Sequence, residues 1–189
     1  MPMNLVHRKL CASRWWSDTV AANLPSALDG IDLGDDVLEI GPGFGATTRV
    51  LVERAPRLTA LEIDEASVHR LRAEFADRVE VVHGDGADMP LPDARFSAVV
   101  CFTMLHHVPS TQLQDRLFAE ARRVLRPGGV FRGVDSQPSV VFRLLHLGDT
   151  MVVLDPATLP GRLRAAGLTD VEVQTTQRGS LAFLARAPR

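Results

Sequence analysis

The sequence predicts a doubly wound, mostly parallel α/β sheet with helices on both faces. From about Asp35 onward, short apolar runs of strand length alternate with segments whose apolar residues recur at helical spacing. This alternation is typical of parallel sheets in which a covering helix follows each strand. The 189 residues fit one such domain, so we expect residues 1–189 to form a single domain.

Turn-forming residues delimit the elements of the first half. A glycine-rich turn follows the first strand, and Asp64 is a favoured N-cap for the helix after the second strand. A loop that contains Pro90 and Pro92 follows the third strand. The predicted elements are a strand over 36–40, a helix over about 46–54, a strand over 58–63, a helix over about 65–75 and a strand over 79–83.

Capping and breaking residues delimit the second half in the same way. Ser110 or Thr111 can cap a helix that the Pro-Gly-Gly run at 127–129 is expected to end. Asp155 is expected to cap the last helix, and Gly167 lies just past its end. The remaining predicted elements are strands over 96–102 and 130–134 and a closing antiparallel hairpin of 171–173 and 181–185.

Two segments lie outside this alternation. Residues 1–30 are expected to form one or two helices that lead into the sheet. Residues 136–154 contain a run of apolar side chains and follow the carboxyl end of a strand, which is the ligand side of an open α/β sheet. This second segment is interpreted either as a short lid or pocket wall, or as an ordinary core helix.

The composition narrows the classes of function and location. A net charge of −2 argues against binding to nucleic acid or anionic lipid through bulk charge. No apolar run approaches the ~20 residues of a membrane span, and no signal pattern is present, so we expect a cytoplasmic protein. The two cysteines and six histidines show no zinc-site spacing, and no metal is expected.

The turn after the first strand predicts a ligand site. Gly41, Gly43 and Gly45 alternate with other residues between a strand and a helix, and glycine allows tight turns and close approach of a ligand. The following helix N-terminus suits a carboxylate or a phosphate. Because Gly41, Gly43 and Ala46 also satisfy the loose dinucleotide pattern, the turn alone does not choose between cofactors.

Acidic residues near three successive strand ends favour one of those cofactors. Glu39 lies just before the glycines, Glu62 lies at the end of the second strand and Asp85 follows the third. An acid in the position of Glu39 suits an ammonium group and is a poor neighbour for a pyrophosphate. These three acids together suit a cofactor with ammonium, ribose and adenine amine groups. They therefore argue against a nicotinamide-dependent reductase.

With these residues in place, the chain resembles the class I S-adenosylmethionine-dependent methyltransferases of the broad small-molecule group. The resemblance implies a Rossmann-like, seven-stranded sheet in the order 3-2-1-4-5-7-6, with strand 7 antiparallel. Where family members often have Phe-Asp before strand four, this chain has Phe96-Ser97, and we expect Ser97 to be structural. The matching motifs, in family order, are VLEIGPGFG at 37–45, LEID at 61–64, GDGADMPL at 84–91, LHHV at 105–108 and EARRVLRPGG at 120–129.

The resemblance also implies roles for the matching positions. Glu39 and the backbone of the glycine turn would hold the methionine part of S-adenosylmethionine, and Glu62 would bind both ribose hydroxyls. Asp85 would accept a hydrogen bond from the adenine amine. The full implied cofactor set is Glu39, Gly41, Pro42, Gly43, Glu62, Ile63, Asp85, Gly86, Ala87 and Phe102.

The residues do not identify a catalytic group. His106 and His107 are candidates for a base because imidazole titrates near neutral pH, and Asp135 could orient a substrate. The family carries a similar histidine pair in members with many substrate types, so packing or a place at the cofactor edge is the alternative. Asp135 could equally be a capping residue.

The expected reaction is an in-line displacement that transfers the methyl group to a small, partly apolar molecule. A nucleic-acid or protein methyltransferase is the alternative, weakened by the near-neutral charge and by the lack of an Asn/Asp-Pro-Pro-aromatic motif at 103–106. An NAD(P)-binding reductase and a non-catalytic cofactor-binding protein are further alternatives. The acceptor and the oligomeric state, monomer or homodimer, stay open.

Overall fold

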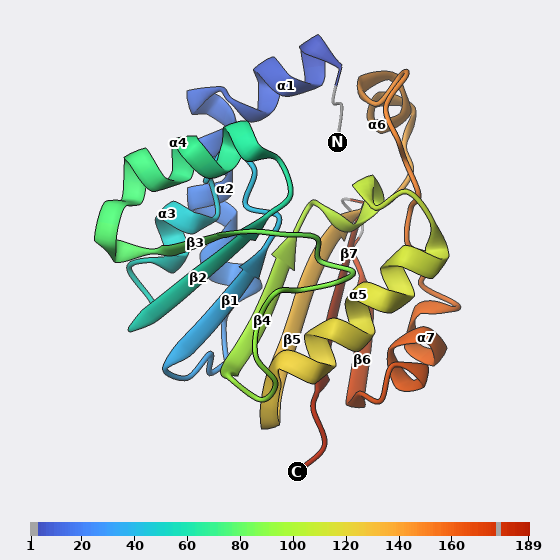
Figure 1. Cartoon of the computed structure of the whole chain (residues 1–189). Helices are drawn as coiled ribbons and strands as arrows, with labels where there is room; N and C mark the ends of the chain where they lie inside the picture. Colours follow the sequence, from blue (N-terminus) through green and yellow to red (C-terminus); the bar gives the residue numbers. More distant parts are fainter. Residues whose placement is uncertain (1–3, 177–178) are drawn as a thin grey trace.

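A seven-stranded sheet forms the centre of the molecule (Figure 1). The computed structural model describes residues 4–176 and 179–189. The strand order is β3-β2-β1-β4-β5-β7-β6, and β7 alone runs antiparallel to its neighbours, which confirms the expected topology. The strands are β1 (Asp36–Ile40), β2 (Arg57–Glu62), β3 (Glu80–His83), β4 (Phe96–Phe102), β5 (Leu125–Ser136), β6 (Thr169–Thr175) and β7 (Ser180–Arg186).

Helices cover both faces of the sheet and leave one apolar core on each side (Figure 1). Leu117 and Leu163 bring α5 and α7 into one core, and Leu24, Leu51 and Leu71 bring α2, α3 and α4 into the other. The helices are α1 (Leu5–Cys11), α2 (Arg14–Ala27), α3 (Thr48–Leu51), α4 (Glu65–Phe75), α5 (Thr111–Val124), α6 (Val140–Leu145) and α7 (Leu159–Ala165), with short 3-10 turns η1 (Ala76–Arg78) and η2 (Leu105–His107).

Several predicted helix boundaries are confirmed by their caps. Asp64 accepts from the backbone N–H of Ser67 at the start of α4, and Ser110 accepts from Leu113 N at the start of α5. Gly167 lies just past α7 with a φ of +86°, a conformation that favours glycine. The two N-terminal helices and the β6–β7 hairpin are also present.

Three elements differ most in extent from the prediction. The last helix begins at Leu159 with Thr158 as its N-cap, because Asp155 instead forms a turn in which its carboxylate accepts from Ala157 N at 2.9 Å. The fifth strand already begins at Leu125, so the Pro-Gly-Gly run lies inside β5 rather than ending α5. Only Thr48–Leu51 is α-helical in the predicted 46–54 helix, and turns flank it.

Strand β1 fixes where a ligand site can form. All five of its residues are buried, and it pairs in parallel with β2 on one side and β4 on the other. The chain therefore leaves β1 toward one edge of the sheet and later returns to its other side. In open α/β sheets, ligands bind in the crevice that such a reversal leaves at the carboxyl ends of the strands.

Ser97 ties β4 to the loop that leads into β1. Its hydroxyl accepts from Asp36 N at 2.9 Å and lies 2.7 Å from the carbonyl oxygen of Leu33 and 2.8 Å from that of Asp36. The expectation of a structural role is confirmed, because one side chain satisfies backbone groups that the sheet leaves unpaired.

No helix in the described ranges is long and apolar enough to cross a bilayer.

We expect Ser97→Ala to lower the free energy of unfolding by about 1–3 kcal/mol, the cost of leaving a buried backbone group without a partner. Urea denaturation followed by circular dichroism measures this loss. Ser26→Ala, at an exposed position on α2, is the control and is expected to change stability by less than about 0.5 kcal/mol. Equal effects of the two substitutions would contradict the structural role of Ser97.

Candidate active site

A cavity of about 720 Å³ lies at the carboxyl ends of the parallel strands. The turn after β1 and the ends of β2 and β4 line part of it, and residues of α1, α2, α4, η2 and α6 also line it. In Figure 1, α1 and α6 both lie beyond this end of the sheet. The cavity is therefore at the position where the sheet topology predicts a ligand.

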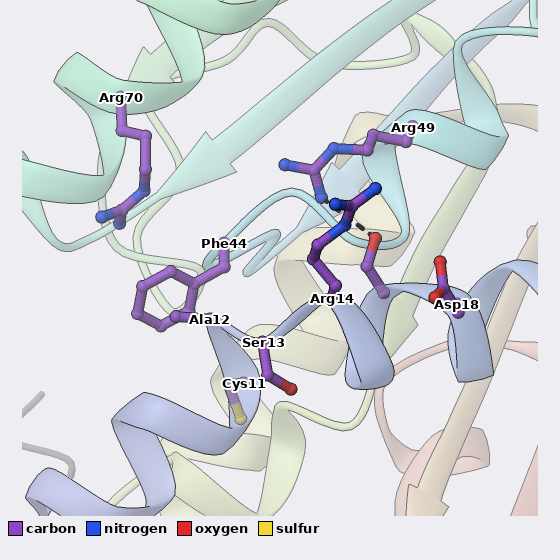
Figure 2. Close-up of a pocket in the computed structure, with 9 residues that line it drawn as sticks. Cys11, Ala12, Ser13, Arg14, Asp18, Phe44, Arg49 and Arg70 are labelled. Carbon is purple, nitrogen blue, oxygen red and sulfur yellow. Dashed lines mark hydrogen bonds between the residues drawn. The ribbon is translucent and has the colours of Figure 1, made fainter.

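A second cavity, of about 550 Å³, lies beside the first and shares Cys11, Phe44 and Arg70 with it (Figure 2). Arg70 stacks over the Phe44 ring at 4.4 Å from the ring centre. The guanidinium of Arg49 is paired with Glu74 at 2.6 Å. Because the larger cavity is the one formed by the strand ends, we take it as the candidate active site.

The glycine turn presents its backbone to the cavity. Gly41 and Gly43 adopt φ angles of +68° and +56°, which residues with a side chain rarely adopt. A Cβ on Gly41 would lie 3.0 Å from the Met104 side chain, whereas a Cβ on Gly43 would point into open space. Together with Pro42, these residues line the cavity, so the turn brings its backbone to the cavity surface, while the N–H groups of Gly41 and Gly43 donate to Leu61 O and to Glu62.

The Glu62 carboxylate is held in place at the cavity wall. One oxygen accepts from Gly43 N and the other from Asp64 N, both at 2.9 Å. The residue is only 6% exposed and lines the cavity. Each carboxylate oxygen can accept more than one hydrogen bond, so both remain able to accept from a pair of ligand hydroxyls.

Glu39 lies behind the cavity wall instead of in it. It is 1% exposed, its carboxylate accepts from the hydroxyls of Thr47 and Thr48, and Thr47 is the residue that reaches the cavity. Burial raises the pKa of Glu39 to about 7; the two hydroxyls lower it and the nearby Glu62 raises it. Any contact between Glu39 and a cofactor ammonium stays a prediction.

The other predicted cofactor residues divide into two groups. Ile63, 43% exposed, and Phe102, 8% exposed, both line the cavity. Asp85 is exposed outside the lining, and its carboxylate accepts from Ala87 N at 2.9 Å. Gly86 packs closely against Ile40 and Leu117. Asp85, Gly86 and Ala87 are thus outside the set of residues that line the cavity, and their adenine contact stays a prediction.

His106 and Asp135 form a buried pair. The His106 Nδ1 atom lies 2.5 Å from one carboxylate oxygen, and the His106 backbone N–H donates to the other at 3.0 Å. Because a carboxylate only accepts, Nδ1 carries the proton and Nε2 is left as the basic nitrogen. Asp135 is 2% exposed and lies outside the cavity lining, so it orients His106 and does not face a substrate.

The cavity contains two more histidines that no local sequence pattern links to His106 and His107. His7, on α1, and His146, just after α6, line the same cavity as His106 and His107, although the four come from three distant segments. Burial, followed by the neighbouring histidines, lowers the pKa of His107 to about 3, and burial also lowers the pKa of His146. Both rings are therefore neutral near pH 7.

Residues 38–132 match the family described as "Methyltransferase domain". The chain belongs to the S-adenosylmethionine-dependent methyltransferase family. This confirms the family, the fold and the family cofactor that the sequence motifs implied. The methyltransferase match ends within β5 and does not extend to the 136–154 segment.

Relatives of this methyltransferase act on different kinds of acceptor. It is 43% identical over 98 residues to a probable S-adenosylmethionine-dependent methyltransferase of Mycolicibacterium smegmatis, covering 52% of this chain and 37% of that protein. It is 32% identical over 160 residues to the 27-O-demethylrifamycin SV methyltransferase of Amycolatopsis mediterranei, and the match covers 80% of this chain and 51% of that protein. It is 39% identical over 110 residues to a probable ribosomal RNA small subunit methyltransferase A of Natronomonas pharaonis, and the match covers 56% of this chain and 39% of that protein.

Among solved structures, a chain in the complex that contains the Haloferax volcanii Trm112 methyltransferase activator is similar over 100% of both chains, with a TM-score of 0.75 and 18% identity. This likeness shows a shared fold. The methyltransferase spans about half or less of the length of the curated relatives it matches.

Glu39→Gln tests the burial of that carboxyl. A carboxyl whose pKa is 4.5 unfolded and about 7 folded destabilises the native state progressively as the pH rises between those values, by about 3 kcal/mol in total. We therefore expect the free energy of unfolding of the variant, relative to that of the wild type, to rise by about 3 kcal/mol between pH 4.5 and pH 7.5. Urea denaturation at each pH measures this difference. The exposed Glu65→Gln variant should show no such change. A pH-independent difference for Glu39→Gln would mean that its carboxyl titrates normally.

Proposed function

We propose that this methyltransferase transfers a methyl group from S-adenosylmethionine to a small, partly apolar molecule. The observation that carries the proposal is that one cavity is lined by two different sets of residues. Gly43 and Glu62, joined by a hydrogen bond, form the first set, which we call the cradle. Phe142 and Leu145 of α6 belong to the second, which we call the acceptor compartment. A cofactor seated in the cradle would present its reactive group to an acceptor that lies in the acceptor compartment.

The cradle fits the chemical groups of S-adenosylmethionine. Glu62 offers a pre-oriented carboxylate to the ribose hydroxyls, and the exposed side chain of Ile63 next to it offers an apolar surface to the adenine. The open backbone at Gly43 leaves room for the methionine end, and Thr47 lies on the same side. Asp85, Gly86 and Ala87 would complete the adenine end, and Phe102 would lie near the methionine end.

The bound cofactor supplies a methyl group that its sulfonium already activates. The residues of the chain then have two tasks, to align the acceptor atom behind that methyl group and to keep water away. Phe142 and Leu145 line the same cavity and would exclude water from the acceptor. His106, held by Asp135, lines the same compartment.

The compartment favours a small acceptor over RNA. Apolar side chains contribute much of the lining, and the net charge of −2 gives little bulk attraction to RNA. The rifamycin methyltransferase supports the same class, because its match extends through most of this chain, whereas the ribosomal RNA relatives match shorter portions. Methylation of RNA is the second candidate, and those relatives are what favours it.

We expect Glu62→Ala to weaken the binding of S-adenosylhomocysteine by about 100-fold, because two hydrogen bonds to a charged group are lost. Isothermal titration calorimetry measures the change, with a thermal unfolding scan to show that the variant is folded. Glu65→Ala, at an exposed position three residues along, is the matched control. Unchanged affinity in Glu62→Ala would place the ribose elsewhere.

The acceptor class can be tested directly with cofactor labelled in its methyl group. We expect label to enter hydroxylated or aminated apolar small molecules, at a rate at least about ten times that without acceptor, and Phe142→Ala to raise KM for the acceptor more than for the cofactor. Ribosomal RNA and a mixed peptide library are the comparison acceptors. Label in the RNA and in no small molecule would overturn the proposed acceptor class in favour of the second candidate.

A further inference from the structure

We propose that the four clustered histidines bind one divalent transition-metal ion of the zinc class. His7, His107 and His146 supply three ligand nitrogens, and His106 supplies the fourth. These are four of the six histidines in the sequence, and they are brought together from α1, η2 and the end of α6. Nothing in the methyl-transfer reaction requires such an ion, so this proposal stands apart from the proposed function.

The ring nitrogens are spaced for a common ion. One nitrogen from each of His7, His107 and His146 lies within 4.8 Å of the other two, and His106 Nε2 lies 3.1 Å from His146 Nε2. Two ligands on a tetrahedral zinc ion, each at 2.0–2.1 Å, are roughly 3.4 Å apart. The His106–His146 pair is already close to that spacing, and the ligand nitrogens of His7, His107 and His146 must approach one another by up to roughly 1.4 Å.

Hydrogen bonds behind the rings select the tautomers that a metal needs. The Nδ1 atoms of His106 and His7 each face a carboxylate, that of Asp135 at 2.5 Å and that of Asp149 at 2.9 Å. Nδ1 of His146 lies 2.8 Å from the Phe142 carbonyl oxygen. Because these oxygens only accept, each Nδ1 donates and each Nε2 keeps its lone pair. Metal-binding histidines are oriented in this way by carboxylates and carbonyls.

The contact between His106 and His146 needs a cation. With both Nδ1 protons already donated, neutral rings would place two lone pairs against each other at 3.1 Å. Either a proton or a metal ion between the rings resolves this repulsion. His107, packed 4.1 Å from the His106 ring centre and 5.3 Å from the His146 ring centre, adds a third imidazole next to the contact.

The surrounding charge favours a divalent ion over a single proton. The side chains of Asp135 and Asp149 are each 1% exposed, and within the described residues their only ion-pair partners are His106 and His7. Two buried carboxylates without an arginine or lysine are costly unless two positive charges lie nearby. One divalent ion among four neutral imidazoles supplies both charges.

Such an ion would join the N-terminal helix to the 136–154 segment across the cavity. His7 and His146 lie on these two segments, and their ring centres are 4.3 Å apart. The expectation of no metal rested on the lack of a short ligand spacing, but residues 7, 107 and 146 are separated by long stretches of chain and can meet only in the folded protein. The ion would brace the acceptor side of the cavity.

Zinc titration of the tag-free, chelator-stripped chain tests the proposal, with a chromogenic zinc chelator as competitor. We expect one equivalent of zinc to bind and, at a zinc concentration 100 times Kd, the unfolding temperature to rise by roughly 5–10 °C. His146→Ala should weaken zinc binding at least about 100-fold, and Asp149→Asn, which keeps every ligand, about 10–100-fold. His69→Ala removes an exposed histidine on α4 and should change nothing.

Cobalt(II) provides a readout on the wild-type chain, so the test does not depend on a variant that folds poorly. Intense visible bands of a four-coordinate site with nitrogen ligands are expected, in contrast to the weak bands of aqueous cobalt. No zinc uptake by the wild type, or equal uptake by wild type and His146→Ala, would overturn the metal site. A proton shared between His106 and His146 would then explain their close contact. Because no cofactor is present in these titrations, their failure would leave the proposed methyl transfer untouched.

Discussion

The reversal of strand order at β1 is the constraint on which the rest of the site depends. β1 is buried along its whole length and pairs with β2 and β4, so the loops that follow these strands diverge at its carboxyl end. The glycine turn, Glu62 and Phe102 reach the cavity from those three strand ends. The sheet therefore brings residues up to about sixty positions apart to one place before any side chain contributes specificity.

Desolvation then separates acids that are equivalent in the sequence pattern. Glu39 points into the protein, where two threonine hydroxyls replace water and burial still raises its pKa. Glu62 is held by two backbone N–H groups and keeps one side toward the cavity, and Asp85 is exposed. One row of carboxylates thus contains a buried hydrogen-bonding group, an oriented group that lines the cavity and a solvated turn residue.

The segments outside the regular α/β alternation form the other half of the cavity. α1 contributes His7, and the 136–154 segment contributes Phe142, Leu145 and His146. These segments meet through Asp149, which accepts from Asn4 N and pairs with His7. In the proposed function, the sheet would provide the cofactor side of the cavity and the two added segments would provide the acceptor side.

The sequence by itself determined the sheet, its strand order through the family motifs, most capping residues and the side of the sheet that carries the site. These features depend on local patterns, namely apolar periodicity, caps and glycine turns, which neighbouring residues specify. Only the tertiary structure decided that Glu39 is buried, that Asp85 lies outside the cavity and that four histidines from three segments share one pocket. Side-chain orientation and the meeting of distant segments depend on packing across the whole domain, and no local pattern encodes that packing.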